Sequence, residues 1–390
     1  MSRRRSALGA PLAWLQLAGE PMRLVAAIAG IAFAVLLMLM QMGIREALFR
    51  SSTRLHERLH ADLVMTSSLY QYQGEAAAFA ERRLIQTLGD PGVESTTPLL
   101  LGVGDWRNPE GRTVKRVFLV GFDPAHDPID LPEIERARDL LRRTGWVMFD
   151  RQSRREYGPV VARFESEGPF LGEVANHRVT VAGLFDLGAS FAADGNLVMS
   201  DVTLRQVSGT LAPGTISVGL IETAPGADPI AVRDRLRQRL GGGDVLVMTL
   251  DEYIAREKEY WARRTPIGFV LTAGLLVGFA VGSVIVYQIL YTDVLDHLHE
   301  YATLKAIGYT DRQLISVVFQ QSFILSAIGF LPGLGLAAVV YYLIREMARL
   351  PADLTVGRAV AVLALTIVMC GVAGALAMRK LAAADPAEVF

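Results

Sequence analysis

The chain has 390 residues, of which 51% are hydrophobic, and a formal net charge of -1. Two or three domains fit this length, but the composition is too apolar for an ordinary soluble enzyme, so part of the chain must lie in lipid. The basic residues are scattered and form no stripe, which excludes a nucleic-acid partner. The single cysteine, Cys370, excludes an intrachain disulfide and, in an apolar run, is typical of helix packing.

The first apolar run predicts a transmembrane helix at residues 24–42, after a cytoplasmic N-terminal segment at residues 1–23. A secretory signal peptide is the alternative, because Arg3, Arg4 and Arg5 form a basic start. The run LVAAIAGIAFAVLLMLMQM is longer than a usual signal-peptide core, and MGIREALF follows it instead of an A-x-A cleavage site. We therefore favour an uncleaved anchor.

Residues 43–264 predict a large α+β domain with stalk helices at both ends. The end segments IREALFRSSTRLHERLH and DEYIAREKEYWARR have the pattern of polar helices that continue the adjoining spans. Short apolar segments bounded by turn residues predict strands: ADLVMTS, VKRVFLVGF, GWVMFD, HRVTVAGLF, NLVMS, GTISVGL and DVLVMTL. The segments GEAAAFAERRLIQTL and DPIAVRDRLRQRL predict interleaved helices.

The last third of the chain predicts three more transmembrane helices, at residues 265–291, 314–344 and 359–378. Their connections are a cytoplasmic loop at residues 292–313, a short periplasmic loop at residues 345–358 and a cytoplasmic tail at residues 379–390. The third span is long enough to require a tilt or a bend, for which Pro332 is the candidate. The predicted fold class is a membrane protein of four transmembrane α-helices, with the α+β domain outside the cytoplasm between helices 1 and 2.

Basic residues beside the first and fourth spans predict that both termini are cytoplasmic: Arg3, Arg4, Arg5, Arg23, Arg379 and Lys380. The four apolar runs contain no charged residue and no histidine, which makes an ion-coupled transporter an unfavoured class. They do contain glycines at every fourth position: Gly274, Gly278 and Gly282 in the second span, and Gly329 and Gly333 in the third. Such faces allow close helix packing, either within one chain or between two copies, and the small number of spans slightly favours a dimer.

His56 to His60, HERLH, match the H-E-x-x-H pattern of zinc proteases. On a helix this spacing places both imidazoles on one face, with the glutamate beside a metal-bound water. However, Arg54 and Arg58 flank and interrupt the motif, and no third ligand is evident downstream. We therefore predict no metal and interpret HERLH as one face of a stalk helix whose apolar side holds Leu55 and Leu59.

The sequence predicts no catalytic residue and no cofactor. A Walker A loop needs a lysine directly after a glycine, and no lysine meets this condition: Lys115, Lys258, Lys305 and Lys380. There is no G-x-S-x-G elbow, and the remaining histidines have the pattern of surface or core residues: His126, His177, His297 and His299. Any nucleotide hydrolysis must therefore come from another chain.

The cytoplasmic loop YTDVLDHLHEYATLKAIGYTDRQL has the most informative pattern of the membrane part. Ala302, Leu304, Ala306 and Ile307 form an apolar strip on a short helix that Gly308 can end. Spacing alone leaves two interpretations open, a docking element for a partner and an amphipathic turn on the membrane surface.

Three segments resemble the permease subunits of ABC exporters of the heterocyst glycolipid exporter (DevC) type, within the MacB, FtsX and lipoprotein-releasing permease superfamily. They are PLAWLQL at residues 11–17, TPIGFVLTAGLLVGFAVGSVIVYQILYTDVLDHLHEYATLKAIGY at residues 265–309, and RKLAAADPAEVF at the C-terminus. The resemblance extends over nearly the whole chain and is weakest in the α+β domain. EYATLKAIGY after a glycine-rich span is its most specific part.

The resemblance implies a non-catalytic permease in the bacterial inner membrane, with residues 43–264 in the periplasm. It implies a homodimer that works with two copies of a separate ABC ATPase, a periplasmic membrane-fusion adaptor and an outer-membrane TolC-like channel. By position it implies that these residues contact the ATPase: Glu300, Tyr301, Thr303, Leu304, Lys305 and Gly308. The substrate it implies is lipid-like or otherwise hydrophobic, as with the glycolipid cargo of that family, and membrane lipid is a further partner it implies.

Two alternative functions are also compatible with the sequence. One is an FtsX-like regulatory permease whose external domain controls a cell-wall hydrolase without moving cargo. The other, less favoured, is a membrane zinc metalloprotease that uses HERLH.

Overall fold

The computed structural model describes residues 21–111, 113–209, 211–297, 299, 303, 307, 310–348 and 352–382. The described chain divides into two compact units: a membrane unit within residues 21–46, 269–344 and 352–382, and a second unit within residues 47–268 and 345–348, of which residues 47–268 form the folded domain. The domain lies between the first and second helices in sequence. This confirms the predicted fold class.

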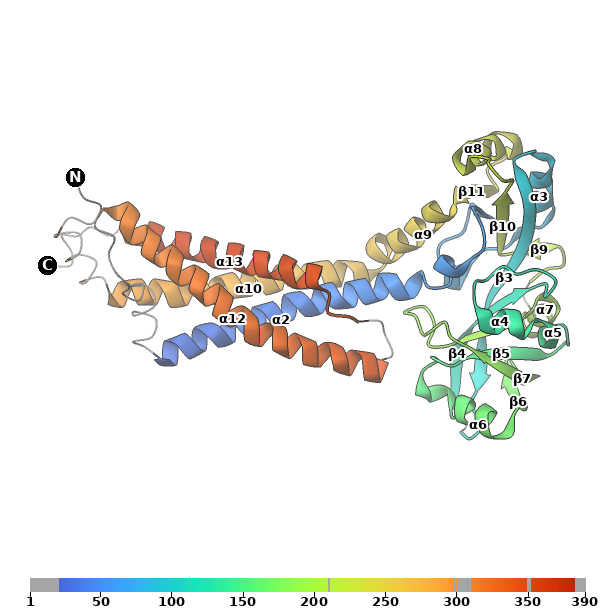
Figure 1. The fold of residues 1–390 in the computed structure, drawn as a ribbon, viewed down its shortest axis with the longest axis horizontal. Coiled ribbons are helices and arrows are strands. Elements are labelled where there is room, and N and C mark those ends of the chain that lie inside the picture. The colour runs from blue at the N-terminus through green and yellow to red at the C-terminus, as the bar shows by residue number, and fades with distance from the viewer. Residues whose placement is uncertain are drawn as a thin grey trace. The chain divides into compact units, whose positions relative to one another are not determined.

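The membrane unit contains four helices long and apolar enough to cross a bilayer. They are α2 (Pro21–Ser52), α10 (Pro266–Asp296), α12 (Asp311–Ala348) and α13 (Val356–Ala382). Figure 1 shows them side by side, and their shared core holds Ile31, Val35, Leu290, Leu325 and Met369. Pro332 lies inside α12, which continues through it. All four helices exceed the roughly 20 residues that a bilayer requires, so each extends past its predicted span.

The folded domain contains a nine-stranded sheet in the order β11-β1-β10-β3-β4-β8-β5-β7-β6. The strands are β1 (Leu63–Ser67), β3 (Val93–Arg107), β4 (Val114–Phe122), β5 (Trp146–Asp150), β6 (Phe170–Val174), β7 (His177–Phe185), β8 (Asn196–Ser200), β10 (Val218–Thr223) and β11 (Val245–Thr249). A small second sheet pairs β2 (Phe79–Ala80) with β9 (Thr215–Ile216).

The strand β3 belongs to two lobes of this domain. Its first half, up to Leu99, pairs with β10, which continues the sheet to β1 and β11. Its second half pairs with β4, and Trp106 and Arg107 at its end pair with β6. Because β6 also pairs with β7, the strands β3-β4-β8-β5-β7-β6 close on themselves. The domain is therefore a six-stranded closed lobe and a four-stranded open lobe that share one strand.

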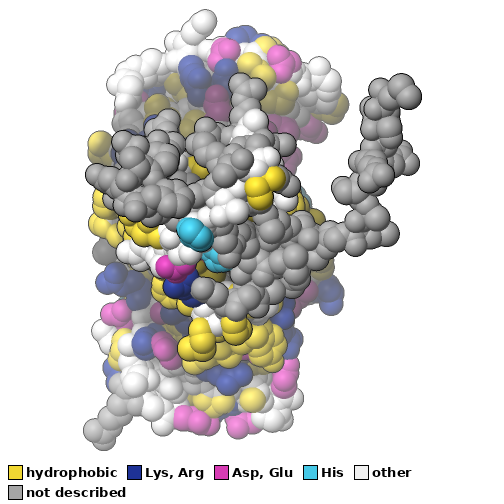
Figure 2. All heavy atoms as spheres, turned by 90° about the vertical axis from the view of Figure 1, so that its left-hand side faces the viewer, with side chains coloured by type: hydrophobic (Ala, Val, Ile, Leu, Met, Phe, Trp, Pro, Cys, Tyr) yellow, Lys and Arg dark blue, Asp and Glu magenta, His cyan; other side chains and the backbone are white. Residues whose placement is uncertain are grey.

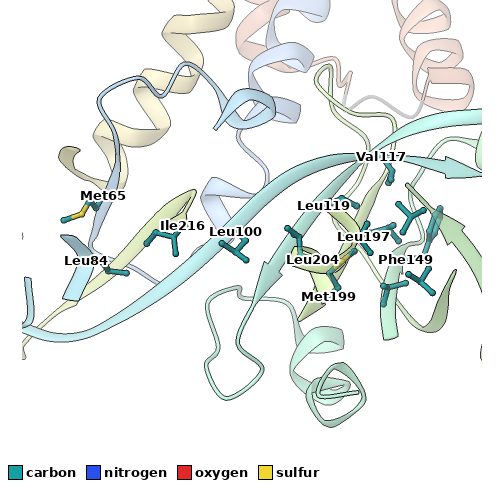
Figure 3. Packing of buried hydrophobic residues seen from close by; sticks show 14 of the residues in the cluster. Met65, Leu84, Leu100, Val117, Leu119, Phe149, Leu197, Met199, Leu204 and Ile216 are labelled. Carbon is teal, nitrogen blue, oxygen red and sulfur yellow. The ribbon is translucent and has the colours of Figure 1, made fainter. Parts of the chain in front are cut away.

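Both faces of β1 and β8 are buried along their whole length, which explains their nearly continuous apolar sequences. In β1, Leu63 and Met65 belong to one hydrophobic core and Val64 to the other. The side chains of β8 alternate in the same way, with Leu197 and Met199 in the first core and Val198 in the second. Figure 3 shows this first core, where Leu100 and Leu119 lie among the labelled side chains.

Short helices cover these faces, and several begin at sequence signals. They are α3 (Arg82–Ile85), α4 (Pro132–Arg136), α5 (Arg138–Leu141), α6 (Val160–Glu167), α7 (Asp201–Ser208), α8 (Pro229–Leu240) and α9 (Leu250–Glu259). Asp228 caps α8 through the backbone N–H of Ile230, with Pro229 at the first helical position. Thr249 and Glu252 form a capping box at the start of α9.

The stalk helices differ from the prediction at both ends of the domain. The first helix ends at Ser52, before HERLH, because the hydroxyls of Ser51, Ser52 and Thr53 bond to carbonyl groups of its last turn. The second stalk, α9, continues into a π-helix at Tyr260–Arg264, and α10 begins after an extended Thr265. The predicted helix at residues 74–88 is instead β2, α3 and two 3-10 turns.

Candidate functional site

Polar side chains join helices at the end of α10, just before the predicted coupling loop. Asp293 and Gln321 are buried, and the Gln321 Nε2 donates to Asp293 Oδ2 over 3.0 Å. His297 Nδ1 donates to the Asp293 carbonyl oxygen over 2.9 Å and lies 3.6 Å from its Oδ1. Arg23 of α2 forms an ion pair with Asp296. This end of α10 is therefore linked to both α2 and α12.

The described part of the loop itself has helical hydrogen bonds and an exposed apolar side chain. Thr303 Oγ1 donates to the His299 carbonyl oxygen over 2.9 Å, and the Ile307 N–H donates to the Thr303 carbonyl oxygen over 3.1 Å. Thr303 is exposed, and Ile307 is 73% exposed. Figure 2 shows histidine side chains, in cyan, at the surface of the molecule near acidic and basic ones. The other predicted contacts lie outside the described residues: Glu300, Tyr301, Leu304, Lys305 and Gly308.

The glycine repeats of the second and third spans face α2 of the same chain. A Cβ at Gly278 would lie 3.3 Å from Leu37 Cβ, and one at Gly282 would lie 2.7 Å from Ala34 Cβ. Gly274 faces Gln41. On α12, a Cβ at Gly329 or Gly333 would lie 2.7 Å from α2 atoms. Packing within the chain therefore occupies both glycine faces.

HERLH does not form the helix that a zinc-protease motif requires. Only His56–Arg58 is helical, as a single 3-10 turn. His56 is buried, whereas His60 is exposed and bonds through Nδ1 to the Asp127 carbonyl oxygen over 2.8 Å. In the described residues no group of three His, Cys, Asp or Glu side chains converges as metal ligands. The stalk-helix interpretation is also wrong, because α2 stops first and His56 points into the domain core against Tyr253.

The partner of His56 is a buried carboxylate, Glu257 of α9. Its Oε2 accepts hydrogen bonds from the Tyr70 hydroxyl and the Gln73 N–H, each over 3.1 Å. Its Oε1 accepts one from Trp261 Nε1, also over 3.1 Å. His56 Nε2 lies 3.6 Å from Oε2. We call these side chains, with Tyr253, the Glu257 cluster.

Burial raises the pKa of the Tyr70 phenol well above its ordinary value, and the charge of Glu257 adds to this effect. Burial also raises the pKa of Tyr253, whose hydroxyl donates to that of Tyr70 over 3.0 Å. Both phenols therefore stay protonated, and together they form a chain of donors that ends on Glu257. Sequence reasoning missed this site, although Tyr253, Glu257 and Trp261 show a signal in their spacing of four residues on one helix face.

A second buried carboxylate, Asp150, lies at the end of β5. Its donors are Asn196 Nδ2 at 2.7 Å and the N–H groups of Gly188, Gln152 and Leu187 at 2.8, 3.0 and 3.2 Å. Burial raises its pKa, and these hydrogen bonds lower it by a smaller amount. Arg54, which follows α2, donates to the Leu187 carbonyl oxygen over 3.1 Å. Asp150 therefore fixes the loop between β7 and β8.

Residues 272–386 match the family model described as FtsX-like permease C-terminal. Over 315 residues, the chain is 23% identical to two proteins of Mycobacterium tuberculosis, from strains CDC 1551 and H37Rv, both named uncharacterized ABC transporter permease. These alignments cover 80% of this chain and 79% of each relative. Residues 272–386 are therefore similar to the C-terminal domain of FtsX-like permeases, in a chain with four helices long and apolar enough to cross a membrane.

Solved structures show a weaker likeness. The periplasmic region of MacB from Actinobacillus actinomycetemcomitans covers 50% of this chain and 91% of its own, with 12% identity and a TM-score of 0.34. The extracellular domain of the transporter YknZ from Gram-positive bacteria covers 48% and 98%, with 15% identity and a TM-score of 0.31.

Proposed function

We propose that this chain is the permease subunit of an ABC exporter of the DevC type, which transmits force from a separate ATPase. The observation that carries this proposal is the match of residues 272–386 to the FtsX-like permease family. The mycobacterial relatives named as ABC transporter permeases support it. The chain itself has no catalytic role in this proposal, and ATP is hydrolysed by the partner.

The ATPase would bind the loop at residues 292–313. Ile307 offers an exposed apolar side chain for a cleft of the partner, and Thr303 lies one helical turn before it. The bonds of Asp293 with Gln321 and of Arg23 with Asp296 hold the base of this loop on three helices. Glu300, Tyr301, Leu304, Lys305 and Gly308 complete the proposed contact surface.

Movement of the loop would then pass along α10 to the folded domain, since only Thr265 separates α10 from the π-helix that continues α9. In the proposed assembly, a second permease copy completes a homodimer in the bacterial inner membrane. The folded domain would work in the periplasm with a membrane-fusion adaptor and an outer-membrane TolC-like channel. The substrate class would be lipid-like or otherwise hydrophobic.

Co-purification tests the ATPase contact. Full-length protein extracted in mild detergent should retain an ABC ATPase, and Ile307→Glu should reduce the captured ATPase by about tenfold or more. Val356→Glu is the matched control, because Val356 is 81% exposed at the start of α13. Capture that is equal in both variants, or intact coupling in Lys305→Glu with Gly308→Pro, would contradict the proposed docking loop.

A regulatory permease is the second candidate, because the matching family model is FtsX-like. In that case the folded domain would control a cell-wall hydrolase without moving cargo. Purification of the full complex separates the two functions: an adaptor favours export, and a hydrolase without an adaptor favours regulation.

A further inference from the structure

One edge of β3 has a gap in its pairing between the two lobes. On this edge β10 pairs up to Leu99 and β6 starts at Trp106, and in the described chain no strand pairs between them. The Asn108 N–H donates to the Thr113 carbonyl oxygen at the β3–β4 turn, so even-numbered residues of β3 bond to β4. The N–H and C=O of Val103 therefore point away from β4, into the gap.

The neighbours of Val103 on the same edge already have partners. The Ser217 hydroxyl accepts from the Leu101 N–H over 3.0 Å, and the Asp105 carbonyl oxygen accepts from the Ala175 N–H over 2.8 Å. No described residue donates to or accepts from the backbone of Val103, whose side chain is 41% exposed. A strand edge with a free donor and acceptor is a template for another extended chain.

Two hollows meet at Val103, with volumes of ≈ 600 and ≈ 340 Å³. Both are lined by Val103 and by Gly74 and Glu75 of the segment 69–78. The larger hollow is lined by both polar and apolar residues, with Leu69, Leu101 and Leu211 among the apolar ones. We call the two hollows together the β3 groove.

The smaller hollow holds charged groups that lack ion-pair partners. Neighbouring charges are paired, Arg107 with Glu173 at 3.0 Å and Lys115 with Glu156 at 2.8 Å. In contrast, Glu75, Asp105 and Arg116 line the hollow and form no ion pair with a described residue. Two carboxylates against one guanidinium favour a ligand with a basic group.

We propose that the β3 groove binds an extended polypeptide segment that pairs with Val103 and places a Lys or Arg beside Glu75 and Asp105. A peptide supplies a donor and an acceptor at the spacing of the free Val103 groups, which an acyl chain does not. Every second side chain of the peptide would enter the larger hollow. This inference goes beyond the transport role and does not depend on it.

The proposal also connects the groove to the Glu257 cluster. Tyr70 and Gln73 belong to the segment 69–78, which lines the groove, and both donate to Glu257. A bound peptide would hold this segment from one side while α9 holds it from the other. Hydrogen exchange should therefore slow at Val103 and also within residues 69–78.

A peptide library tests the proposal on the full-length protein in nanodiscs. Linear heptapeptides displayed on phage are selected on the protein, and the best one is synthesised for fluorescence anisotropy. We expect selected sequences to contain Lys or Arg, and Val103→Pro to weaken binding by about tenfold, since it removes one backbone donor. Val103→Ala is the control, since it keeps both backbone groups. Glu75→Gln with Asp105→Asn should weaken binding about threefold, with the difference lost in high salt.

Two versions of the peptide are N-methylated, one at its odd-numbered and one at its even-numbered residues. The version whose methyl groups replace the N–H groups facing β3 should not bind, and the other version should bind as before. Failure to select any peptide that binds would overturn the proposal. So would binding that Val103→Pro and methylation leave unchanged, or that lysophosphatidylcholine displaces, since the groove would then be a lipid site. If Val103→Pro fails to fold, Ala77→Arg places a large side chain in the lining of the groove and must give the same loss of peptide binding.

Discussion

The folded domain contains two buried carboxylates, Glu257 and Asp150, that are held in different ways. Asp150 accepts three of its four hydrogen bonds from backbone N–H groups of nearby loops. Glu257 accepts mainly from the side chains of Tyr70 and Trp261, with Gln73 as its backbone donor. Its donors come from the segment after β1 and from the π-helix.

Backbone and side-chain donors constrain a carboxylate to different degrees. Backbone donors fix a loop in one conformation, because they change direction only when the chain itself changes. Side-chain donors can rotate and exchange partners at a smaller cost. Asp150 is thus suited to fixing a local loop, and Glu257 to holding the segment after β1 against α9 and the π-helix.

The largest effect should come from removing Glu257. Glu257→Leu leaves Tyr70, Trp261 and the Gln73 N–H without their acceptor, and it should lower the free energy of unfolding by about 3–5 kcal/mol. Thermal unfolding of the detergent-solubilised protein measures the loss. Glu259→Leu, an exposed position on the same helix, is the control and should change stability by less than about 1 kcal/mol. Equal losses in both variants would show that the Glu257 cluster adds no stability.

Asp150→Leu should have a smaller and more local effect, because water can reach part of the loop that it releases. We expect a loss of about 2–3 kcal/mol. Hydrogen exchange should become faster in residues 150–154 and 186–196 only, whereas Glu257→Leu should affect residues 53–60, 70–75 and 253–264. Identical exchange patterns in the two variants would remove the distinction between them.

The stability that Asp150 contributes should depend on pH. Burial raises its folded pKa above the unfolded value, so the folded state binds the proton more tightly. The wild type should therefore gain stability relative to Asp150→Asn as the pH falls from 7 through the folded pKa, and the gain should level off below the unfolded pKa. Melting curves of both proteins from pH 7 to pH 3.5 check this sign. A wild type that loses stability relative to Asp150→Asn as the pH falls would contradict the raised pKa.

The smallest effect should come from His56, whose two ring nitrogens make no hydrogen bond within the described structure. His56→Phe keeps the ring against Tyr253 and should change stability by about 1 kcal/mol or less, in either direction. The zinc content of the purified protein provides a second measurement. About one zinc per wild-type chain, lost in His56→Phe, would revive the metal-site hypothesis.

Local patterns in the sequence predicted much of the fold. The segments HRVTVAGLF and NLVMS coincide with β7 and β8, and the apolar runs mark the four helices. The strand β3 was missed, because Thr96, Thr97 and Pro98 interrupt its apolar pattern. Its pairing with β10, β4 and β6 depends on residues distant in sequence.

Of the candidate site, the sequence predicted the loop between α10 and α12 but not the bonds that hold it. Asp293 lies just past the predicted end of the second span, and its burial depends on Gln321 of another helix. For HERLH, in contrast, the sequence predicted a stalk helix that the structure does not contain. Its spacing fits a helix, but the hydroxyls of Ser51 and Ser52 favour the end of that helix, and tertiary packing buries only one of its two histidines.

The shared strand β3 has a consequence for how the folded domain unfolds. Each lobe takes part of its hydrogen-bonded ladder from the same fifteen residues. Neither lobe can therefore be excised as an autonomous folding unit, and truncation at either end of β3 would leave the other lobe with an incomplete sheet. The two lobes should melt together in one cooperative transition.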